Sequence, residues 1–246
     1  MIKIEIKGDV LLITDTHLGA RGSSTIFRGL FRNYYDTILF PFIIENNIKH
    51  VIHLGDFFEN RNSISVADIQ YVMDEFIPLL EDNDIQLYII AGNHDIHFKN
   101  TNRIHSLSIF NASKNVTVVT DDILVLDTEG KSFVLCPWVN NENEDELFKA
   151  LEEYSSDDYI LCGHFEFKDA LMYANSIPCD HGLDLKKFSG FHKVLSGHFH
   201  HSSKYGNVHY IGALFHYNWD DAEDWRGYTV YDTKKNKFIK HENRDS

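Results

Sequence analysis

The chain has 246 residues, of which 43% are hydrophobic and 13% aromatic, so it can bury a sizeable core, and its length lies within the range of a single α/β domain. Its formal net charge of −14 argues against loose adhesion to nucleic acid through a broad basic surface, although not against an enzyme whose cations are bound metals. No apolar run approaches the roughly 20 residues that span a bilayer, and no apolar signal region opens the chain, so we expect a soluble cytoplasmic protein.

Strand-like and helix-like segments alternate along the early part of the chain. Residues 1–10 alternate apolar and charged side chains, which is typical of a strand. Apolar runs that favour strands and end in glycine or a polar cluster are 10–14, 50–55, 85–92, 159–163 and 193–197. Helix-like spacings of three and four residues occupy 27–47 and 65–83, with Ser65 as the expected cap of the second helix. Strand–helix–strand alternation predicts a largely parallel sheet.

Shorter connections follow in the rest of the chain. Residues 115–138 favour hairpin-connected strands with a turn at 128–131, and further strands are expected at 207–214 and 226–242. This mixture predicts an α/β fold in which two packed mixed β-sheets are flanked by helices. We expect residues 1–246 to form it as a single domain.

The three cysteines, Cys136, Cys162 and Cys179, are odd in number and lie far apart. Because no C-x-x-C spacing occurs, the sequence supports neither a disulfide framework nor a thiolate zinc site. Cys162 closes an apolar run and is expected to be a small buried hydrophobe.

Polar side chains follow five of the predicted strands. They are Asp15 and His17, Asp56, Asn93 to Asp95, His164, and His198 with His200. In open α/β sheets, ligands bind beyond the carboxyl ends of the strands, so these side chains are expected to converge. Residues i and i+2 of a strand point to the same side, which predicts that His198 and His200 face one object while His201 turns away.

Aspartate, asparagine and histidine without sulfur form a ligand set that suits Mn, Fe, Zn or a similar divalent ion. Seven such side chains suit two ions about 3.5–4 Å apart, with hydroxide held between them as the nucleophile. Asp56 is the expected bridge, since a carboxylate offsets the repulsion between two cations. His94 follows a ligand directly and is expected to act as an acid or hydrogen-bond donor, while Asp95 orients a loop or an imidazole.

Each motif taken alone has a structural explanation. A D-x-H sequence such as 15–17 is usually a turn, and the GNHD sequence at 92–95 could begin a helix with a capping asparagine. Taken together, however, these strand ends would leave carboxylates and imidazoles without partners, which is costly unless a cation binds them. His53, inside a predicted strand, is expected to be a hydrogen-bonded core residue.

Five motifs resemble, in order and spacing, those of the calcineurin-like metallophosphoesterases. They are DTHLG (15–19), GDFFENR (55–61), GNHD (92–95), GHFE (163–166) and GHFH (197–200). Within that superfamily, the first two look like the nuclease subunit of the DNA double-strand-break repair complex, the SbcD and Mre-eleven group. The segments GNHDIHFKN, CPWV, DHGL and YIGA…WRGYTVYDT are similar to the short bacteriophage members that act in recombination.

The resemblance implies the α/β/β/α sandwich of the metallophosphoesterases and a site with two metals. It places Asp15, His17, Asp56 and His200 on one metal, and Asp56, Asn93, His164 and His198 on the other. His94 takes the role of the catalytic histidine that is not a ligand. The implied activity is Mn²⁺-dependent hydrolysis of DNA in exonuclease and endonuclease modes, with Mg²⁺, Fe²⁺ or Zn²⁺ as alternative ions. Implied partners are an SMC-like coiled-coil ATPase and a second copy of the chain, in the host cytoplasm if the protein is phage-encoded.

Three features depart from the family pattern. Cellular members often carry histidine where Glu59 stands, which leaves the balance of exonuclease and endonuclease modes open. No capping or ATPase-binding region is evident before the chain ends at Ser246. Few basic residues flank the motifs, and Arg21, Arg61 and Lys99 are the expected substrate contacts, with Arg28, Arg32 and Arg103 as further candidates.

We therefore expect a metal-dependent DNA nuclease. One rival is a phosphoesterase for small nucleotides or phosphoproteins on the same fold, because the metals bind the phosphate while the surrounding loops select the rest of the substrate. The other rival is a binding scaffold without chemistry, which would have no reason to retain every ligand position and His94.

Overall fold

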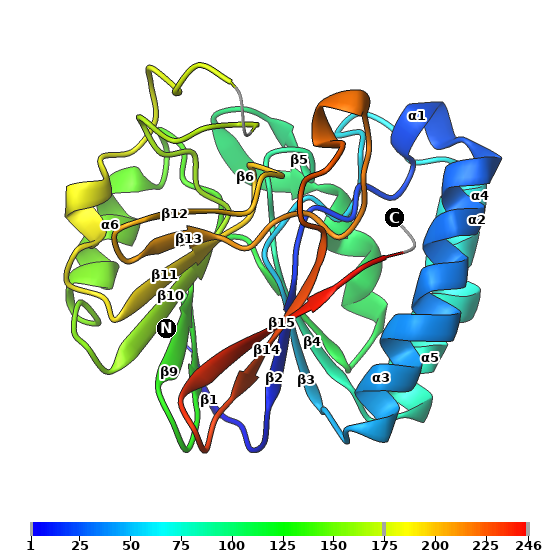
Figure 1. Cartoon of the computed structure of the whole chain (residues 1–246), viewed down its shortest axis with the longest axis horizontal. Coiled ribbons are helices and arrows are strands. Elements are labelled where there is room, and N and C mark those ends of the chain that lie inside the picture. The colour runs from blue at the N-terminus through cyan, green and yellow to red at the C-terminus, as the bar shows by residue number, and fades with distance from the viewer. Residues whose placement is uncertain (1, 174–175, 245–246) are drawn as a thin grey trace.

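The computed structural model describes residues 2–173 and 176–244, and two β-sheets pack face to face at its centre (Figure 1). The seven-stranded sheet contains, in spatial order, β1 (Ile2–Glu5), β8 (Leu124–Asp127), β9 (Ser132–Leu135), β10 (Tyr159–Gly163), β11 (Lys193–Ser196), β13 (Val208–Tyr210) and β12 (Ser203–Tyr205). The six-stranded sheet contains β15 (Lys237–Glu242), β14 (Gly227–Asp232), β2 (Val10–Ile13), β3 (His50–His53), β4 (Gln86–Ile90) and β7 (Val116–Val119).

Both sheets are mixed, as the sequence predicts. Strands β2, β3, β4 and β7 run parallel, while β14 lies antiparallel to β2. In the other sheet, β9, β10, β11 and β13 are parallel, and β8 and β9 form the predicted hairpin around residues 128–131. The expectation that residues 115–119 join this hairpin is wrong, because β7 pairs with β4 in the opposite sheet.

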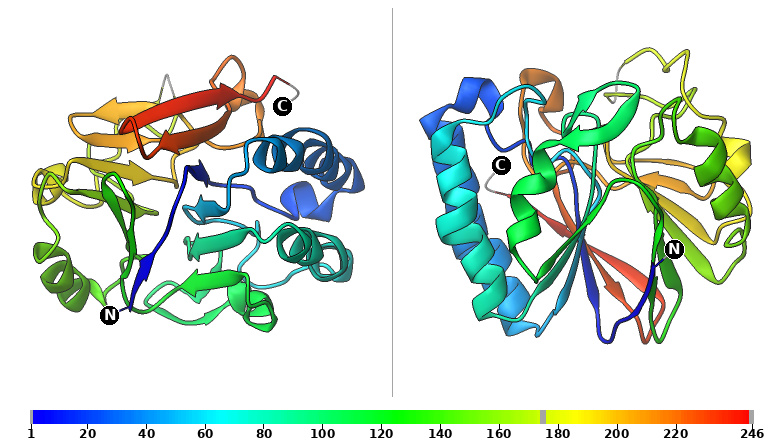
Figure 2. Two further views of the ribbon diagram at one scale, coloured as in Figure 1. Left: turned by 90° about the horizontal axis from the view of Figure 1, so that it is seen from below. Right: turned by 180° about the vertical axis from the view of Figure 1, so that it is seen from behind.

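Two long helical segments cover the outer face of the six-stranded sheet (Figures 1 and 2). The first comprises α2 (Thr25–Tyr34), the π-helical turn η1 (Tyr35–Leu39) and α3 (Phe40–Glu45); the second comprises α4 (Val66–Tyr71), the π-helical turn η2 (Val72–Phe76) and α5 (Ile77–Asp82). Each widened turn precedes a proline, Pro41 or Pro78, whose ring crowds the carbonyl four residues earlier and which lacks an N–H donor. Ser65 caps α4 by accepting from the Asp68 N–H at 3.1 Å, as predicted.

Several further elements are not predicted from the sequence. Helix α6 (Glu144–Glu152) covers the seven-stranded sheet, with Leu147 and Leu151 one turn apart on its buried face. The hairpin of β5 (Ile96–Phe98) and β6 (Thr101–His105) follows the GNHD sequence, so that sequence does not begin a helix. The remaining short elements are α1 (Ala20–Ser23) and the 3₁₀ turns η3 (Ser106–Ala112), η4 (Leu185–Phe188) and η5 (Trp219–Asp221).

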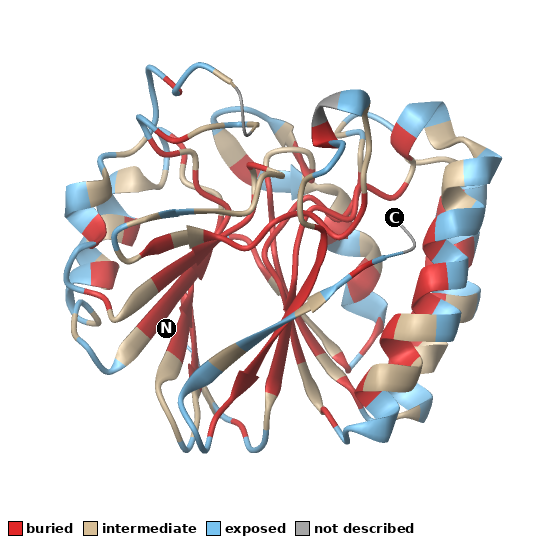
Figure 3. Cartoon of the chain, in the orientation of Figure 1, coloured by how far each residue is buried: buried red, intermediate tan, exposed pale blue. Residues whose placement is uncertain are grey.

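Strand β2 illustrates how the layers form. All four of its residues are buried; Leu11 and Ile13 pack toward the helices, while Val10 and Leu12 pack toward the other sheet. This burial on both faces is typical of a central parallel strand. The result is the predicted order of helix, sheet, sheet and helix. Burial continues into the loops that follow the central strands (Figure 3), which brings polar residues into the interior.

In the described part of the chain, no helix is both long enough and apolar enough to cross a membrane.

Candidate metal centre

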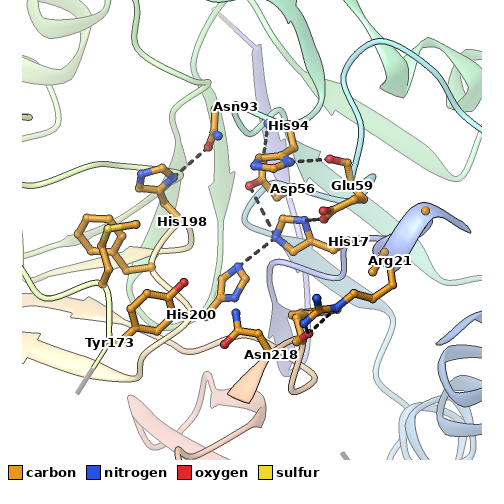
Figure 4. A pocket seen from close by; sticks show the side chains of 15 residues that line it. His17, Arg21, Asp56, Glu59, Asn93, His94, Tyr173, His198, His200 and Asn218 are labelled. Atoms are coloured by element: carbon orange, nitrogen blue, oxygen red, sulfur yellow. Dashed lines mark hydrogen bonds and ion pairs between the residues drawn. The ribbon is translucent and has the colours of Figure 1, made fainter. Parts of the chain in front are cut away.

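The loops that follow β2, β3, β4, β10 and β11 converge at one site. They carry all seven side chains predicted as ligands. Figure 4 shows residues from four of these loops: His17, Asp56, Asn93, His198 and His200. Asp15, His17, Asp56 and His164 are buried, while His198 and His200 are 16% and 19% exposed at the side chain. The site opens into a pocket of about 560 Å³ that His94 also lines.

The first group of donors, the Asp15 cluster, consists of Asp15, His17 and His200. The Nε2 atoms of the two imidazoles lie 3.1 Å apart, and each lies 3.8 Å from Oδ1 of Asp15. Oxygen and nitrogen ligands held about 2.0–2.2 Å from one cation are separated by about 3–3.6 Å. The three donor atoms are therefore spaced closely enough to share one divalent ion.

The second group, the His164 cluster, consists of Asn93, His164 and His198. Oδ1 of Asn93 lies 3.1 Å from His164 Nε2 and 2.9 Å from His198 Nδ1. His164 Nδ1 lies 2.8 Å from the Leu54 carbonyl oxygen, to which it can donate, so that the Nε2 lone pair faces the cluster. This group also has the spacing of ligands around one ion.

Asp56 lies between the two clusters. Its Oδ2 is 3.2 Å from His164 Nε2 and 3.9 Å from His17 Nε2. Its Oδ1 accepts a hydrogen bond of 2.8 Å from the backbone N–H of His94. Oδ2 is therefore the Asp56 oxygen that faces both clusters. If two ions share Asp56, both would bind this one oxygen.

The electrostatics of the site fit a bound cation. Burial alone would lower the pKa of His164, but the charges of Asp56 and Asp15 outweigh it and raise the pKa to about 9. Burial would likewise raise the pKa of Asp56, yet the charge of His164 holds it well below its usual range. The buried carboxylates thus favour positive charge among the imidazoles, which a divalent ion supplies without protons.

Backbone conformation explains how short loops present so many donors. Asp15, His17, Asp56 and His198 adopt φ values of 50°, 44°, 57° and 86°, in the left-handed region that side chains rarely occupy. Such strain concentrates at functional sites. The expectation that strand alternation positions His198 and His200 is wrong, because β11 ends at Ser196, before either residue. A left-handed turn at His198 instead directs the two imidazoles to different clusters.

Glycines beside the predicted ligands leave room for the side chains of neighbouring loops. A Cβ at Gly197 would lie 2.1 Å from Thr14 Oγ1 and 2.8 Å from Asp15 Oδ2. A Cβ at Gly92 would lie 2.2 Å from Asp56 Oδ1. Because no neighbour can yield by that much at a buried carboxylate, glycine precedes the ligand at these two strand ends.

His94 and Asp95 occupy different positions around the ligands. His94 Nδ1 lies 2.6 Å from the Glu59 carbonyl oxygen, and its ring borders the pocket. Asp95 is buried and accepts from the N–H groups of Phe57, Phe58 and Gly92 at 3.3, 3.1 and 3.0 Å. Burial and the charge of Asp56 raise the pKa of Asp95 to about 6. Asp95 therefore fixes the loop that carries Asp56.

Two glutamates that sequence reasoning did not connect to the metal site contact histidines that are predicted as ligands. Glu59 Oε2 lies 2.7 Å from His17 Nδ1, opposite the nitrogen that faces the Asp15 cluster. Glu166 Oε2 lies 3.5 Å from His198 Nε2, again opposite the nitrogen that faces the cluster. Carboxylates behind ligating histidines fix the ring orientation and raise its basicity. The signal in the sequence was a glutamate inside two of the motifs, GDFFENR and GHFE, shortly after Asp56 and His164.

Tyr217 and Arg226 are further residues that the sequence did not single out. The Tyr217 hydroxyl lies 2.9 and 2.6 Å from the carbonyl oxygens of Asp15 and Thr16. Arg226 is fully buried, forms an ion pair of 2.7 Å with Asp221 and donates to the His200 carbonyl oxygen at 3.1 Å. The acidic stretch at 220–224 just before it was the available signal.

The six basic residues considered as substrate contacts differ in where they lie and in whether their charge is already paired. Arg21 lines the pocket, and its Nε donates to the Tyr217 carbonyl oxygen at 2.9 Å, whereas Arg61 and Lys99 are not among the lining residues. The other candidates, Arg28, Arg32 and Arg103, form ion pairs with Asp68, Glu75 and Glu142. Their charges are therefore already offset within the chain.

His53 and His201 lie where the sequence predicts. His53 is fully buried; its Nδ1 accepts from the Gly55 N–H at 3.2 Å and its Nε2 lies 3.0 Å from Thr16 Oγ1. His201 turns away from the clusters, with Nδ1 2.7 Å from Asp224 Oδ1. Both histidines support the ligand loops through these bonds.

Comparison with known proteins places this site in a family. Residues 8–202 match the model of the calcineurin-like phosphoesterases. Exonuclease subunit 1 of Enterobacteria phage T4 is 29% identical over 232 residues, which cover 94% of this chain and 67% of that protein. The DNA double-strand break repair protein Mre11 of Methanocaldococcus jannaschii is 26% identical over 198 residues, which cover 76% of this chain and 50% of that protein. The protein of the same name from Sulfolobus acidocaldarius is 35% identical over 88 residues, which cover 35% of this chain and 22% of that protein. The chain thus spans half or less of these archaeal relatives. The chain belongs to the calcineurin-like phosphoesterase family.

Proposed function

We propose that this protein is a Mn²⁺-dependent DNA nuclease that hydrolyses phosphodiester bonds with two divalent ions per chain, in recombination or repair. The observation that carries the proposal is that two donor clusters meet at Oδ2 of Asp56. His94, which lines the same pocket, lies beside them. The names of the phage and archaeal relatives favour DNA as the substrate. The SMC-like ATPase partner and the homodimer that the resemblance implies belong to the same proposal.

The seven ligand side chains divide between the two ions. In this assignment Asp15, His17 and His200 hold one ion, Asn93, His164 and His198 hold the other, and Asp56 is shared. When bound, the ions would offset the charge of the phosphodiester and lower the pKa of water to near 7. Glu59 and Glu166 keep His17 and His198 oriented from behind.

His94 supplies the proton chemistry of the protein itself. With Nδ1–H donating to the Glu59 carbonyl oxygen, its Nε2 is the nitrogen left for substrate. In the imidazolium form, Nε2–H donates to a phosphoryl oxygen or protonates the leaving alkoxide. Asp95 supports this step indirectly, since it fixes the Asp56 loop against which the His94 backbone is bonded.

Substrate contacts are assigned to Arg21, Arg61 and Lys99. Arg21 is the strongest of these because it borders the pocket beside His17. Arg61 and Lys99 follow the Asp56 and His94 loops along the chain and would bind the phosphate backbone farther from the reacting bond.

A phosphoesterase for small nucleotides or phosphoproteins is the second candidate. It is favoured by the net charge of −14 and by the ion pairs that neutralise Arg28, Arg32 and Arg103. A small phosphoester needs fewer basic contacts than a long polyanion does.

Cleavage of end-labelled single- and double-stranded DNA tests the two candidates. Assays contain Mn²⁺, Mg²⁺ or a chelator, with an aryl phosphodiester alongside and the His94→Ala protein as the control for contaminating nuclease. DNA products that require Mn²⁺ and are absent from the control would support the nuclease, and their lengths would separate exonuclease from endonuclease action. Hydrolysis of the aryl ester with the DNA left intact would favour the second candidate.

A further inference from the structure

A second group of potential metal ligands lies outside the seven residues of the candidate centre. It consists of Glu166, Cys179 and His181, whose ligand atoms all lie within 4.8 Å of one another. Cys179 Sγ is 3.4 Å from Glu166 Oε1 and 3.6 Å from His181 Nδ1, and His181 Nε2 is 2.6 Å from the same Glu166 oxygen. The proposed hydrolysis reaction assigns no role to the Cys179 thiol.

The backbone presents these side chains together. The Leu183 N–H donates to the Glu166 carbonyl oxygen at 2.8 Å, and the Cys179 N–H donates to the Ala170 carbonyl oxygen at 2.9 Å, so the two ends of the segment 166–183 lie side by side. Gly182, with φ of 98°, allows the return: a Cβ there would lie 2.5 Å from the Glu166 carbonyl oxygen. The cluster is thus fixed by main-chain bonds as well as by its side chains.

We propose that Cys179 Sγ, His181 Nε2 and Glu166 Oε1 bind a thiophilic divalent cation, Zn²⁺, at a site separate from the two-metal centre. A sulfur ligand beside nitrogen and oxygen selects Zn²⁺ over Mn²⁺ or Mg²⁺. On binding, the Cys179 thiol loses its proton to solvent. With three protein ligands, the fourth position of the tetrahedron holds water.

The spacing of the donors fits this ion with one adjustment. Bonds of about 2.3 Å to sulfur and 2.0–2.2 Å to nitrogen and oxygen place tetrahedral ligands about 3.3–3.6 Å apart. The sulfur contacts of 3.4 Å to Glu166 and 3.9 Å to His181 Nε2 lie near that range, whereas the Glu166–His181 contact of 2.6 Å must widen. The His181 side chain is 72% exposed, so its ring has room to move by this amount.

Neighbouring groups suit a cation here. Asp180 Oδ1 lies 2.7 Å from His181 Nδ1 and can hold the tautomer whose Nε2 lone pair faces the ion. The other oxygen of Glu166 lies 3.5 Å from His198 Nε2. Met172 and Tyr173, on the same segment, line the pocket. The Zn²⁺ would therefore fix the wall of the pocket and restrain the carboxylate behind one ligand histidine.

Cobalt substitution tests the site without reference to turnover. Co²⁺ titrated into the full chain should give a thiolate-to-metal charge-transfer absorption, and the proposed two-metal centre cannot supply it because its ligands contain no sulfur. The absorption should vanish in Cys179→Ala and persist in Cys136→Ala, whose thiol is fully buried in the core. His181→Ala, a change at an exposed residue that should leave the fold intact, should raise the dissociation constant of this Co²⁺ at least ten-fold.

Zinc content provides the second measurement. Wild type should retain one more equivalent of Zn²⁺ per chain than Cys179→Ala after dialysis against a weak chelator, whether or not the chain cleaves DNA. Wild type without the charge-transfer absorption, or an absorption equally strong in Cys179→Ala, would overturn the proposal and leave these residues as a hydrogen-bonded cluster. Failure of the nuclease assay would not affect either reading.

Discussion

Replacing Glu59 by glutamine should weaken the binding of one of the two proposed ions and leave the other unchanged. The Glu59 carboxylate lies 2.7 Å from His17 Nδ1, the ring nitrogen opposite the Asp15 cluster, and the His17 side chain is 4% exposed. Burial alone would raise the pKa of Glu59, but the hydrogen bond with His17 lowers it, so the group is ionised at neutral pH. Glutamine preserves the size and an acceptor oxygen while it removes the charge.

The magnitude follows from the position of the carboxylate. Loss of a partner behind a ligating histidine typically costs about 10–100-fold in metal affinity. Because the Glu59 side chain is 39% exposed and solvent screens its charge, we expect the lower end, about ten-fold, which corresponds to about 1.4 kcal/mol. The ion at the His164 cluster should bind as in wild type, since the contact of Glu166 with His198 is unchanged.

Calorimetric titration with Mn²⁺ at neutral pH measures both steps. Glu152→Gln, an exposed change on α6, is the matched control and should reproduce both wild-type affinities. Two wild-type affinities in Glu59→Gln would refute the role of Glu59 behind His17. An equal loss in both steps would show that the residue acts on the whole site rather than on one ligand.

Three further changes have defined outcomes. His94→Ala should keep two equivalents of Mn²⁺ in the same calorimetry and lose about 10²–10⁴-fold in DNA cleavage; unchanged cleavage would remove His94 from the reaction. Arg226→Met should lower the unfolding free energy in urea by about 3–5 kcal/mol, because it leaves Asp221 buried without its partner. Lys235→Met, at an exposed ion pair, should leave the unfolding free energy close to that of wild type. Burial lowers the pKa of His53 from 6.5 to about 3. The contribution of neutral His53 to the free energy of unfolding is therefore fully present above pH 6.5 and is lost as the pH falls toward 3. The difference in unfolding free energy between wild type and His53→Gln should therefore shrink over that interval, and a constant difference would contradict a neutral His53.

The strands of the two sheets could be predicted because each is encoded by a short local run of residues. Residues 10–13 are apolar without interruption, which marks a strand buried on both faces, and residues 128–131 mark a turn. The partner of β7 could not be predicted in the same way. Its sequence fits a hairpin as well as a parallel pair, and only packing of the connecting segment places it beside β4.

The ligand loops were accessible to sequence reasoning because glycine and polar residues follow apolar runs at the carboxyl ends of parallel strands. The residues that support those ligands were not. Glu59 reaches His17, and Arg226 reaches the His200 loop, only after distant segments have packed together. The turn at His198 was also hidden, since a left-handed histidine cannot be distinguished from an extended one in the sequence.

Anomalous diffraction from crystals equilibrated with Mn²⁺ would locate the two proposed ions. We expect two peaks about 3.5–4 Å apart, one bordered by His17 and His200, the other by His164 and His198, with Asp56 Oδ2 between them. Crystals of Asp56→Asn should lose at least one of the peaks. A single peak in the wild type, or two peaks that do not share Asp56, would contradict the two-metal site proposed for this chain.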